Sequence, residues 1–142
     1  MRFGLILFAV TIAAPLWADL AAIKAEPSPD KRASRALDHA GQTLNSIREH
    51  FSQLSIPQLT QELDEFREAM DLTVDSLAAT GKNPAKNPKE FKKTELTLRI
   101  YMRKLKTLEH DLNIEERPLL APVLHRIEQI QDDLVQGIMR KK

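Results

Sequence analysis

The chain has no cysteine and only four glycines in 142 residues, and these absences exclude several kinds of site. Without cysteine there is no disulfide, no thiol nucleophile and no covalently attached haem, which needs a C-x-x-C-H segment. Glycine-rich phosphate loops and the G-x-S-x-G nucleophile turn are missing as well. We therefore predict that the protein is not an enzyme and holds no cofactor.

Histidine is also scarce, with four residues in the chain. A di-iron helical bundle needs a glutamate three residues before an inward-facing histidine, and none of the four has one. Helical periodicity places His39, His110 and His125 on outer positions and His50 beside the buried stripe. Met70 lies on a buried stripe, where methionine usually fills gaps in a core.

The first 18 residues have the pattern of an export signal. A short basic start, Met1-Arg2, precedes an apolar run from Phe3 to Ala14, and Pro15 and the small residue Ala18 follow. The run is shorter than the roughly 20 residues of a membrane-spanning helix, so we expect cleavage after Ala18 and no transmembrane segment afterwards. A retained anchor is the alternative. We predict a periplasmic or secreted protein with a signal peptide (residues 1–18), a flexible mature N-terminus (19–28) and a helical domain (29–142).

Apolar residues recur at alternating steps of three and four along the rest of the chain, which predicts an all-α fold. The clearest stripe is Phe91, Thr94, Leu98, Tyr101, Leu105, Leu108 and Leu112. Similar stripes predict helices over residues 29–55, 57–80 and 88–113. The last helix begins either near 113, with a kink at Pro122, or at Pro122 itself.

Residues with cap and turn chemistry separate these helices. Ser28 and Asn87 are candidate N-caps, each followed by proline, and Gly81 is a candidate C-cap. The short turn at residues 54–57 requires antiparallel neighbours, so we expect an antiparallel four-helix bundle made of two helical hairpins. The alternative is an elongated pair of hairpins that completes its core by dimerising. Gly41, beside Ala40, would let a neighbouring helix approach closely.

Charge is unevenly distributed along the chain although the formal net charge is only +1. The segment 57–80 carries an outward acidic stripe of Asp64, Glu68, Asp71 and Asp75. The following segment carries an outward basic stripe of Lys92, Arg99, Arg103 and Lys106. Such stripes are either solvated faces that keep a bundle soluble or binding surfaces.

The basic stripe is the candidate binding site. In an exported protein it would meet an unidentified protein or an anionic component of the envelope. We predict no nucleic-acid partner, because an exported protein rarely meets nucleic acid and the stripe lacks interleaved exposed aromatic residues for base stacking. The acidic face of one copy could also meet the basic face of another and form a homodimer.

Two acidic pairs offer an alternative metal site. Asp71-x-x-x-Asp75 and Glu128-x-x-x-Asp132 are separated by 57 residues. They resemble the E/D-x-x-x-D motif of phosphate-uptake regulator bundles, and the resemblance implies a metal cluster on the helix surface. The chain also resembles small periplasmic helical chaperones in size, but Leu63 stands where their L-T-x-x-Q motif has glutamine. The sequence thus predicts an exported, non-enzymatic interaction or structural module, or alternatively a metal-binding or chaperone-like envelope stress protein.

Overall fold

The computed structural model describes residues 16–140. This part of the chain is all-helical and contains no strand. Its five α-helices are α1 (Leu16–Lys24), α2 (Pro29–His50), α3 (Ile56–Ala79), α4 (Lys89–Asp111) and α5 (Ala121–Met139). Two short 3-10 helices, η1 (Phe51–Gln53) and η2 (Arg117–Leu120), precede α3 and α5. Of the predicted signal peptide, residues 1–15 lie outside the described residues.

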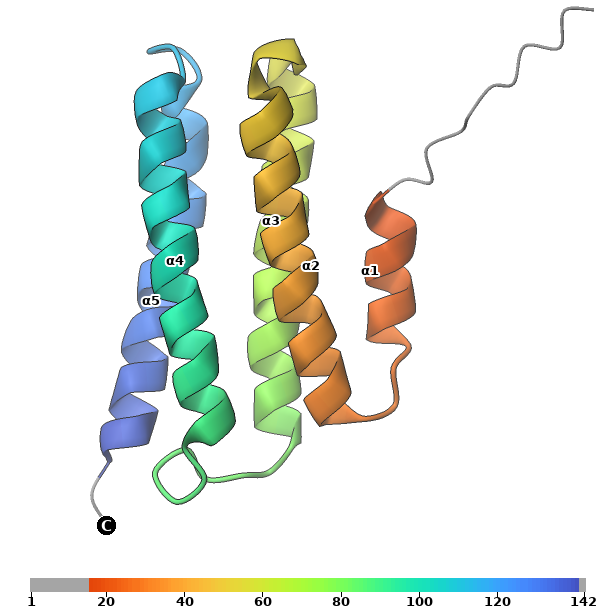
Figure 1. The fold of residues 1–142 in the computed structure, drawn as a ribbon, viewed down its shortest axis with the longest axis vertical. Helices are drawn as coiled ribbons and strands as arrows, with labels where there is room; N and C mark the ends of the chain where they lie inside the picture. The colour runs from red at the N-terminus through yellow and green to blue at the C-terminus, as the bar shows by residue number, and fades with distance from the viewer. Residues whose placement is uncertain (1–15, 141–142) are drawn as a thin grey trace, which may run out of the picture.

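The four long helices lie side by side and alternate in direction (Figure 1). The closest pair is α2 with α3; α4 and α5 form a second pair, and the two pairs meet through α2–α4 and α3–α5 contacts. Helix α1 packs on α2 and α3, on the side away from the second pair (Figure 1). Within residues 16–140, no helix combines the length and apolar character that crossing a membrane requires.

The core consists of the predicted apolar stripes. All seven residues of the stripe from Phe91 to Leu112 are buried, and they share one core with the stripes of the other long helices. Phe51, Leu54, Val74 and Ile138 lie at the ends or margins of their stripes and are only partly buried. Packing in this core removes the apolar face of each long helix from water. This burial stabilises the helices without any disulfide.

The helix ends confirm two of the three predicted caps. The Ser28 hydroxyl accepts a hydrogen bond from the Lys31 backbone N–H, at 3.5 Å, and Gly81 ends α3 with a positive φ of 69°. The prediction for Asn87 is wrong. Its N–H donates to the Asn83 carbonyl at 2.8 Å, and Pro88 occupies the N-cap position without a side-chain cap. Asn87 therefore closes the turn over residues 83–87 and does not cap α4.

The last helix begins beside Pro122, which was one of the two predicted alternatives, and not near residue 113. Pro122 lies in the first turn of α5, which begins at Ala121. The Asn113 side chain accepts a hydrogen bond from the Glu116 N–H at 3.0 Å, but the segment after it forms a turn and then η2. Proline therefore stands where its missing N–H interrupts no helical hydrogen bond.

Residues 19–24 differ from the flexible segment that the sequence predicted. They belong to α1, where Leu20 is only 1% exposed and Ile23 is buried beside it. Leu20 and Ile23 are three residues apart and so share one helix face, which covers α2 and α3. Lys24 adds an ion pair with Glu68 of α3. Burial of Leu20 and Ile23 and this ion pair attach α1 to α2 and α3.

Candidate functional site

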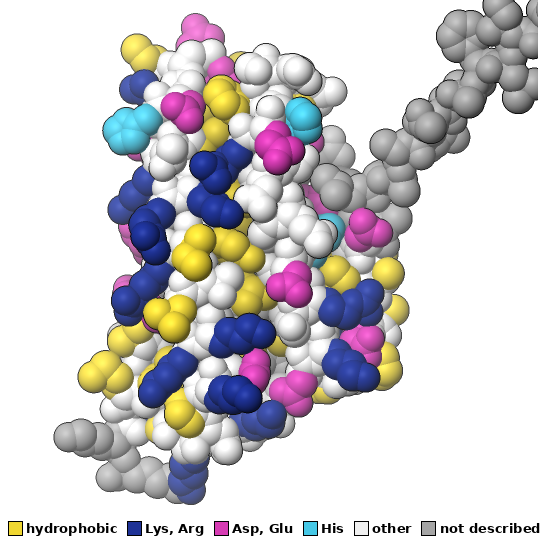
Figure 2. Space-filling view, in the orientation of Figure 1, with side chains coloured by type: hydrophobic (Ala, Val, Ile, Leu, Met, Phe, Trp, Pro, Cys, Tyr) yellow, Lys and Arg dark blue, Asp and Glu magenta, His cyan; other side chains and the backbone are white. Residues whose placement is uncertain are grey.

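The four basic residues of the predicted site lie on the outer face of α4. Lys92, Arg99, Arg103 and Lys106 are all exposed. They point outward because Leu98 and Leu105, on the opposite face of the same helix, are buried in the core. Lysine and arginine side chains accordingly gather over the α4 side of the molecule in Figure 2.

Exposed apolar side chains, which were not predicted from the sequence, lie among these cations. Leu96 and Ile100 of α4 are 56% and 45% exposed, and Met139 of α5 is 72% exposed. A shallow groove of about 280 Å³ runs between α4 and α5. We call it the α4–α5 groove; it is lined by Lys92, Glu95, Leu96, Arg99, Val135, Ile138 and Met139. Figure 2 shows yellow apolar patches beside the blue cations on this face.

One carboxylate interrupts the basic face and is neutralised. Glu95 is buried at the base of the groove and accepts a hydrogen bond from Arg99 Nε at 2.6 Å. This contact holds the Arg99 guanidinium along the groove wall. Among the described residues, Lys92, Arg103 and Lys106 have no carboxylate within ion-pair distance. Three cations of the site are therefore available to a ligand.

The basic surface continues beyond α4 into the α3–α4 loop. A hollow of about 640 Å³ at this end is lined by Lys82, Lys86, Asn87, Pro88, Lys89, Glu90 and Lys92. Lys82 is held by Asp30 of α2, at 3.1 Å. The N-terminus of α4 has no side-chain cap and adds its partial positive charge to the same end. The cationic surface thus extends from the loop to the middle of α4.

The predicted acidic stripe of α3 is largely neutralised by cations from its surroundings. Glu68 pairs with Lys24 of α1, Asp71 with Arg126 of α5 at 2.7 Å, and Asp64 with Arg67 at 3.3 Å. These pairs are local or join α3 to its neighbours α1 and α5. The acidic stripe therefore contributes to packing between helices, in contrast to the basic stripe of α4.

The predicted metal residues do not come together. Asp71 is engaged by Arg126, whereas Asp75, Glu128 and Asp132 are exposed. Across residues 16–140 there is no group of three or more histidine, aspartate or glutamate side chains that could hold a metal ion. The i, i+4 acidic pairs of α3 and α5 thus remain separate surface features.

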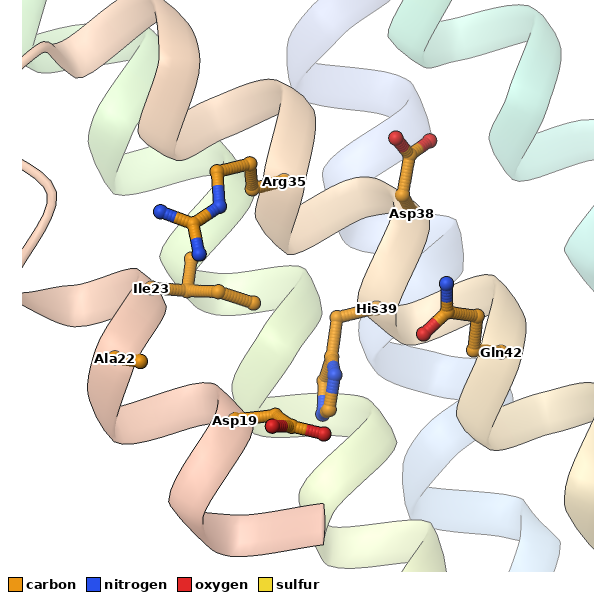
Figure 3. A pocket seen from close by; sticks show the side chains of 7 residues that line it. All are labelled: Asp19, Ala22, Ile23, Arg35, Asp38, His39 and Gln42. Atoms are coloured by element: carbon orange, nitrogen blue, oxygen red, sulfur yellow. The ribbon is translucent and has the colours of Figure 1, made fainter.

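A buried polar pair between α2 and α3 was missed. His39 was expected on an outer position, and this prediction is wrong: it is 3% exposed, with Nε2 2.9 Å from Glu65 Oε1. Figure 3 shows its ring directed into a hollow of about 280 Å³ beside Asp19, between α1 and α2. The periodicity of α2 alone could not reveal this burial, because α1 supplies the cover.

The polar contact continues along the α2–α3 interface. Thr43 Oγ1 and Glu62 Oε2 are buried without a hydrogen-bond partner in the described structure. Burial, and secondarily the nearby charge of Glu65, raise the pKa of the Glu62 carboxyl, while His50 opposes this effect. The α2–α3 interface therefore holds several buried polar groups beside its apolar core.

No protein-family model, curated protein or solved structure matches this chain. Its function is therefore inferred from the chemistry of its surface.

Proposed function

We propose that this is an exported, non-enzymatic protein whose four long helices form an antiparallel four-helix bundle, and that it binds an anionic partner through the outer face of α4. The partner is a protein or an anionic component of the envelope. Export is supported by the apolar run from Phe3 to Ala14. Binding is supported chiefly by one observation: three of the four residues of this site, Lys92, Arg103 and Lys106, are exposed and lack an ion-pair partner among the described residues.

A solubilising role explains this surface less well than binding does. Surfaces that serve solubility alone usually mix both signs of charge. Arg99 and Arg103 are instead like charges at i, i+4, an arrangement that costs an isolated helix about 0.2–0.5 kcal/mol. Clustered like charges raise the local potential, which attracts anions and speeds their association. The acidic stripe of α3, whose charges are mostly paired, offers no comparable surface.

Binding to fluorescently labelled polyglutamate tests the proposal with a defined anionic probe. We expect measurable affinity at low ionic strength that declines as salt screens the charges. The R103Q/K106Q variant removes two exposed cations of α4 and should weaken binding about tenfold, about 1.4 kcal/mol for the two charges together. Replacing all four, K92Q/R99Q/R103Q/K106Q, should abolish it.

A charge-matched control separates a site from a net-charge effect. The K31Q/R48Q variant also removes two exposed cations, but from α2. We expect it to bind polyglutamate as the unmodified protein does. Equal weakening by the two double variants would contradict a binding face on α4.

A further inference from the structure

We infer that the outer face of α4, together with the end of α5, binds the surface of an anionic lipid bilayer. This inference rests on the proposed function and names the partner class. Its basis is the combination of projecting apolar side chains and surrounding cations in one surface. The apolar side chains match the boundary between headgroups and acyl chains of such a bilayer, and the cations match its anionic headgroups.

The apolar component consists of Leu96, Ile100 and Met139. They are three of the five large hydrophobic side chains that are exposed in the described residues. Because α4 and α5 pack together and Leu96 and Met139 line the same groove, these side chains project from a single face. Side chains of this kind can enter the boundary between headgroups and acyl chains of a bilayer.

The cationic component flanks those side chains. Lys92 and Arg99 line the groove, and Arg103 lies one turn further along the exposed face of α4. A basic residue is attracted to an anionic membrane within roughly a Debye length of the surface. Lys86 and Lys89 line a hollow together with Lys92 and extend this charge to the loop end of α4. Charge attraction and apolar insertion would therefore act from the same side.

A second copy of the chain fits this surface poorly. A two-fold symmetric dimer would place the same patch on itself. Arg99 and Arg103 of one copy would then approach the same cations of the other, and like charges across an interface disfavour association. Between Lys92 and Lys106 the one carboxylate of α4, Glu95, is buried against Arg99 and cannot compensate this repulsion.

A docked helix from an acidic protein is also less suitable than a bilayer. On α4 the lining of the groove covers only residues 92–99, about 12 Å of helix. Helix-in-groove recognition uses anchors at i, i+3, i+4 and i+7, which extend over about the same eight residues and need a continuous apolar trough. Lys92, Glu95 and Arg99 interrupt the apolar lining here. Here the apolar side chains project instead of lining a deep cleft. A bilayer surface accommodates projecting side chains without a matching cavity.

The lack of cysteine allows a direct test with single labelled positions. The protein, purified in the form that the producing cell makes, carries Ile100→Cys or, as a control on α2, Glu49→Cys, each with an environment-sensitive fluorophore. Vesicles of phosphatidylcholine with phosphatidylglycerol should shift the emission of the label at position 100 to the blue. Pure phosphatidylcholine vesicles should not, and the label at position 49 should not respond to either. No shift at position 100, or equal shifts at both positions, would overturn the inference.

Vesicle co-sedimentation of matched variants tests the two components. L96S/M139S should lower partitioning onto the anionic vesicles about fivefold, whereas I114S, at an exposed apolar residue between η2 and α4, should leave it unchanged. R103Q/K106Q should lower it about tenfold, which corresponds to about 1.4 kcal/mol for the two residues together. Equal effects of L96S/M139S and I114S would overturn apolar insertion.

The polyglutamate assay separates this inference from the proposed function. If polyglutamate binding depends on Arg103 and Lys106 while anionic vesicles give neither a shift nor sedimentation, the bilayer is the wrong partner and an acidic protein takes its place. If neither probe binds in a way that depends on Arg103 and Lys106, the binding face itself is wrong.

Discussion

At the scale of single residues, Tyr101 makes the closest contact between α4 and α2. Its hydroxyl donates a hydrogen bond to the Leu37 carbonyl at 2.7 Å, and its ring meets Phe66 edge-on, with centroids 5.9 Å apart. Gly41 makes this approach possible, because a Cβ at that position would lie 2.5 Å from the Tyr101 hydroxyl oxygen. The predicted close approach at Gly41 is thus confirmed, with Tyr101 as the neighbour.

We predict that Gly41→Ala destabilises the protein, although alanine is the better helix former by about 1 kcal/mol. The buried Tyr101 ring has little room to move, so the clash should outweigh the helical gain. Overpacking of this kind typically costs about 1–3 kcal/mol, which urea unfolding would measure. An increase in stability would contradict the described packing.

Tyr101→Phe provides the companion measurement. Losing the hydroxyl should cost about 1 kcal/mol at neutral pH. Burial, and next the charge of Asp38, raise the pKa of Tyr101 to about 12. The folded protein therefore favours the neutral phenol, a contribution that is complete below pH 10 and lost as the pH rises from 10 to about 12. The variant should lack this alkaline loss of stability.

We predict that Glu62→Gln stabilises the protein at neutral pH. The folded state raises the pKa of this carboxyl, so its charged form is disfavoured and one buried oxygen has no partner. In the unmodified protein this penalty is present at neutral pH and is relieved as the pH falls through the raised folded-state pKa. Unfolding curves from pH 7 to 4 should therefore converge for the two proteins, and a variant that is less stable at pH 7 would show that the charge is compensated.

His39 and Glu65 should behave as a coupled pair. Replacing either one alone leaves the other buried without its partner, at a cost of about 1–3 kcal/mol. His39→Leu with Glu65→Leu should cost less than the sum of the single changes, because no orphaned polar group remains. A double-variant cycle in urea measures this coupling. Additive single effects would mean that the 2.9 Å contact contributes nothing.

At the scale of elements, α1 is an addition to the four long helices that depends on few contacts. Leu20 lies fully within the core, whereas the Lys24–Glu68 pair is largely exposed to solvent. We predict that Leu20→Ala costs about 2–4 kcal/mol and releases α1, whereas Lys24→Gln costs less than about 1 kcal/mol. Hydrogen exchange should show early loss of protection confined to residues 19–24 in the Leu20 variant. Unchanged protection there would mean that other contacts hold α1.

Features that lie within one helix could be predicted from the sequence, whereas features that depend on packing between helices could not. The four apolar stripes were predicted because each lies within one helix and repeats at a helical period, as Leu98 and Leu105 illustrate. The order in residues 19–24 and the burial of His39 were missed, because each depends on a neighbour far away in the sequence. The exposure of Lys92 and Arg103 was predicted from the face opposite the stripe. The pairing of Asp71 with Arg126 required the packing of α3 on α5.

At the scale of the whole molecule, the ion pairs that join helices and the cations that could bind a partner lie on different surfaces. Paired ions such as Glu68 and Asp71 lie where α3 meets its neighbours, whereas the cations of α4 face solvent. Exposed apolar side chains at Leu96 and Ile100 belong to the same face. This coincidence of charge and apolar surface, rather than the slightly positive total charge, supports the proposed binding face.

Site-specific photocrosslinking in the producing cells would show whether the outer face of α4 is a binding surface. A photoreactive residue at position 100 on α4 should give adducts, and one at position 49 on α2 should give few. Replacing Arg103 and Lys106 with glutamine should reduce the adducts at position 100 without changing the abundance of the protein. Binding through the outer face of α4 is contradicted if position 100 gives no more adducts than position 49. It is also contradicted if the adducts at position 100 persist in the R103Q/K106Q background.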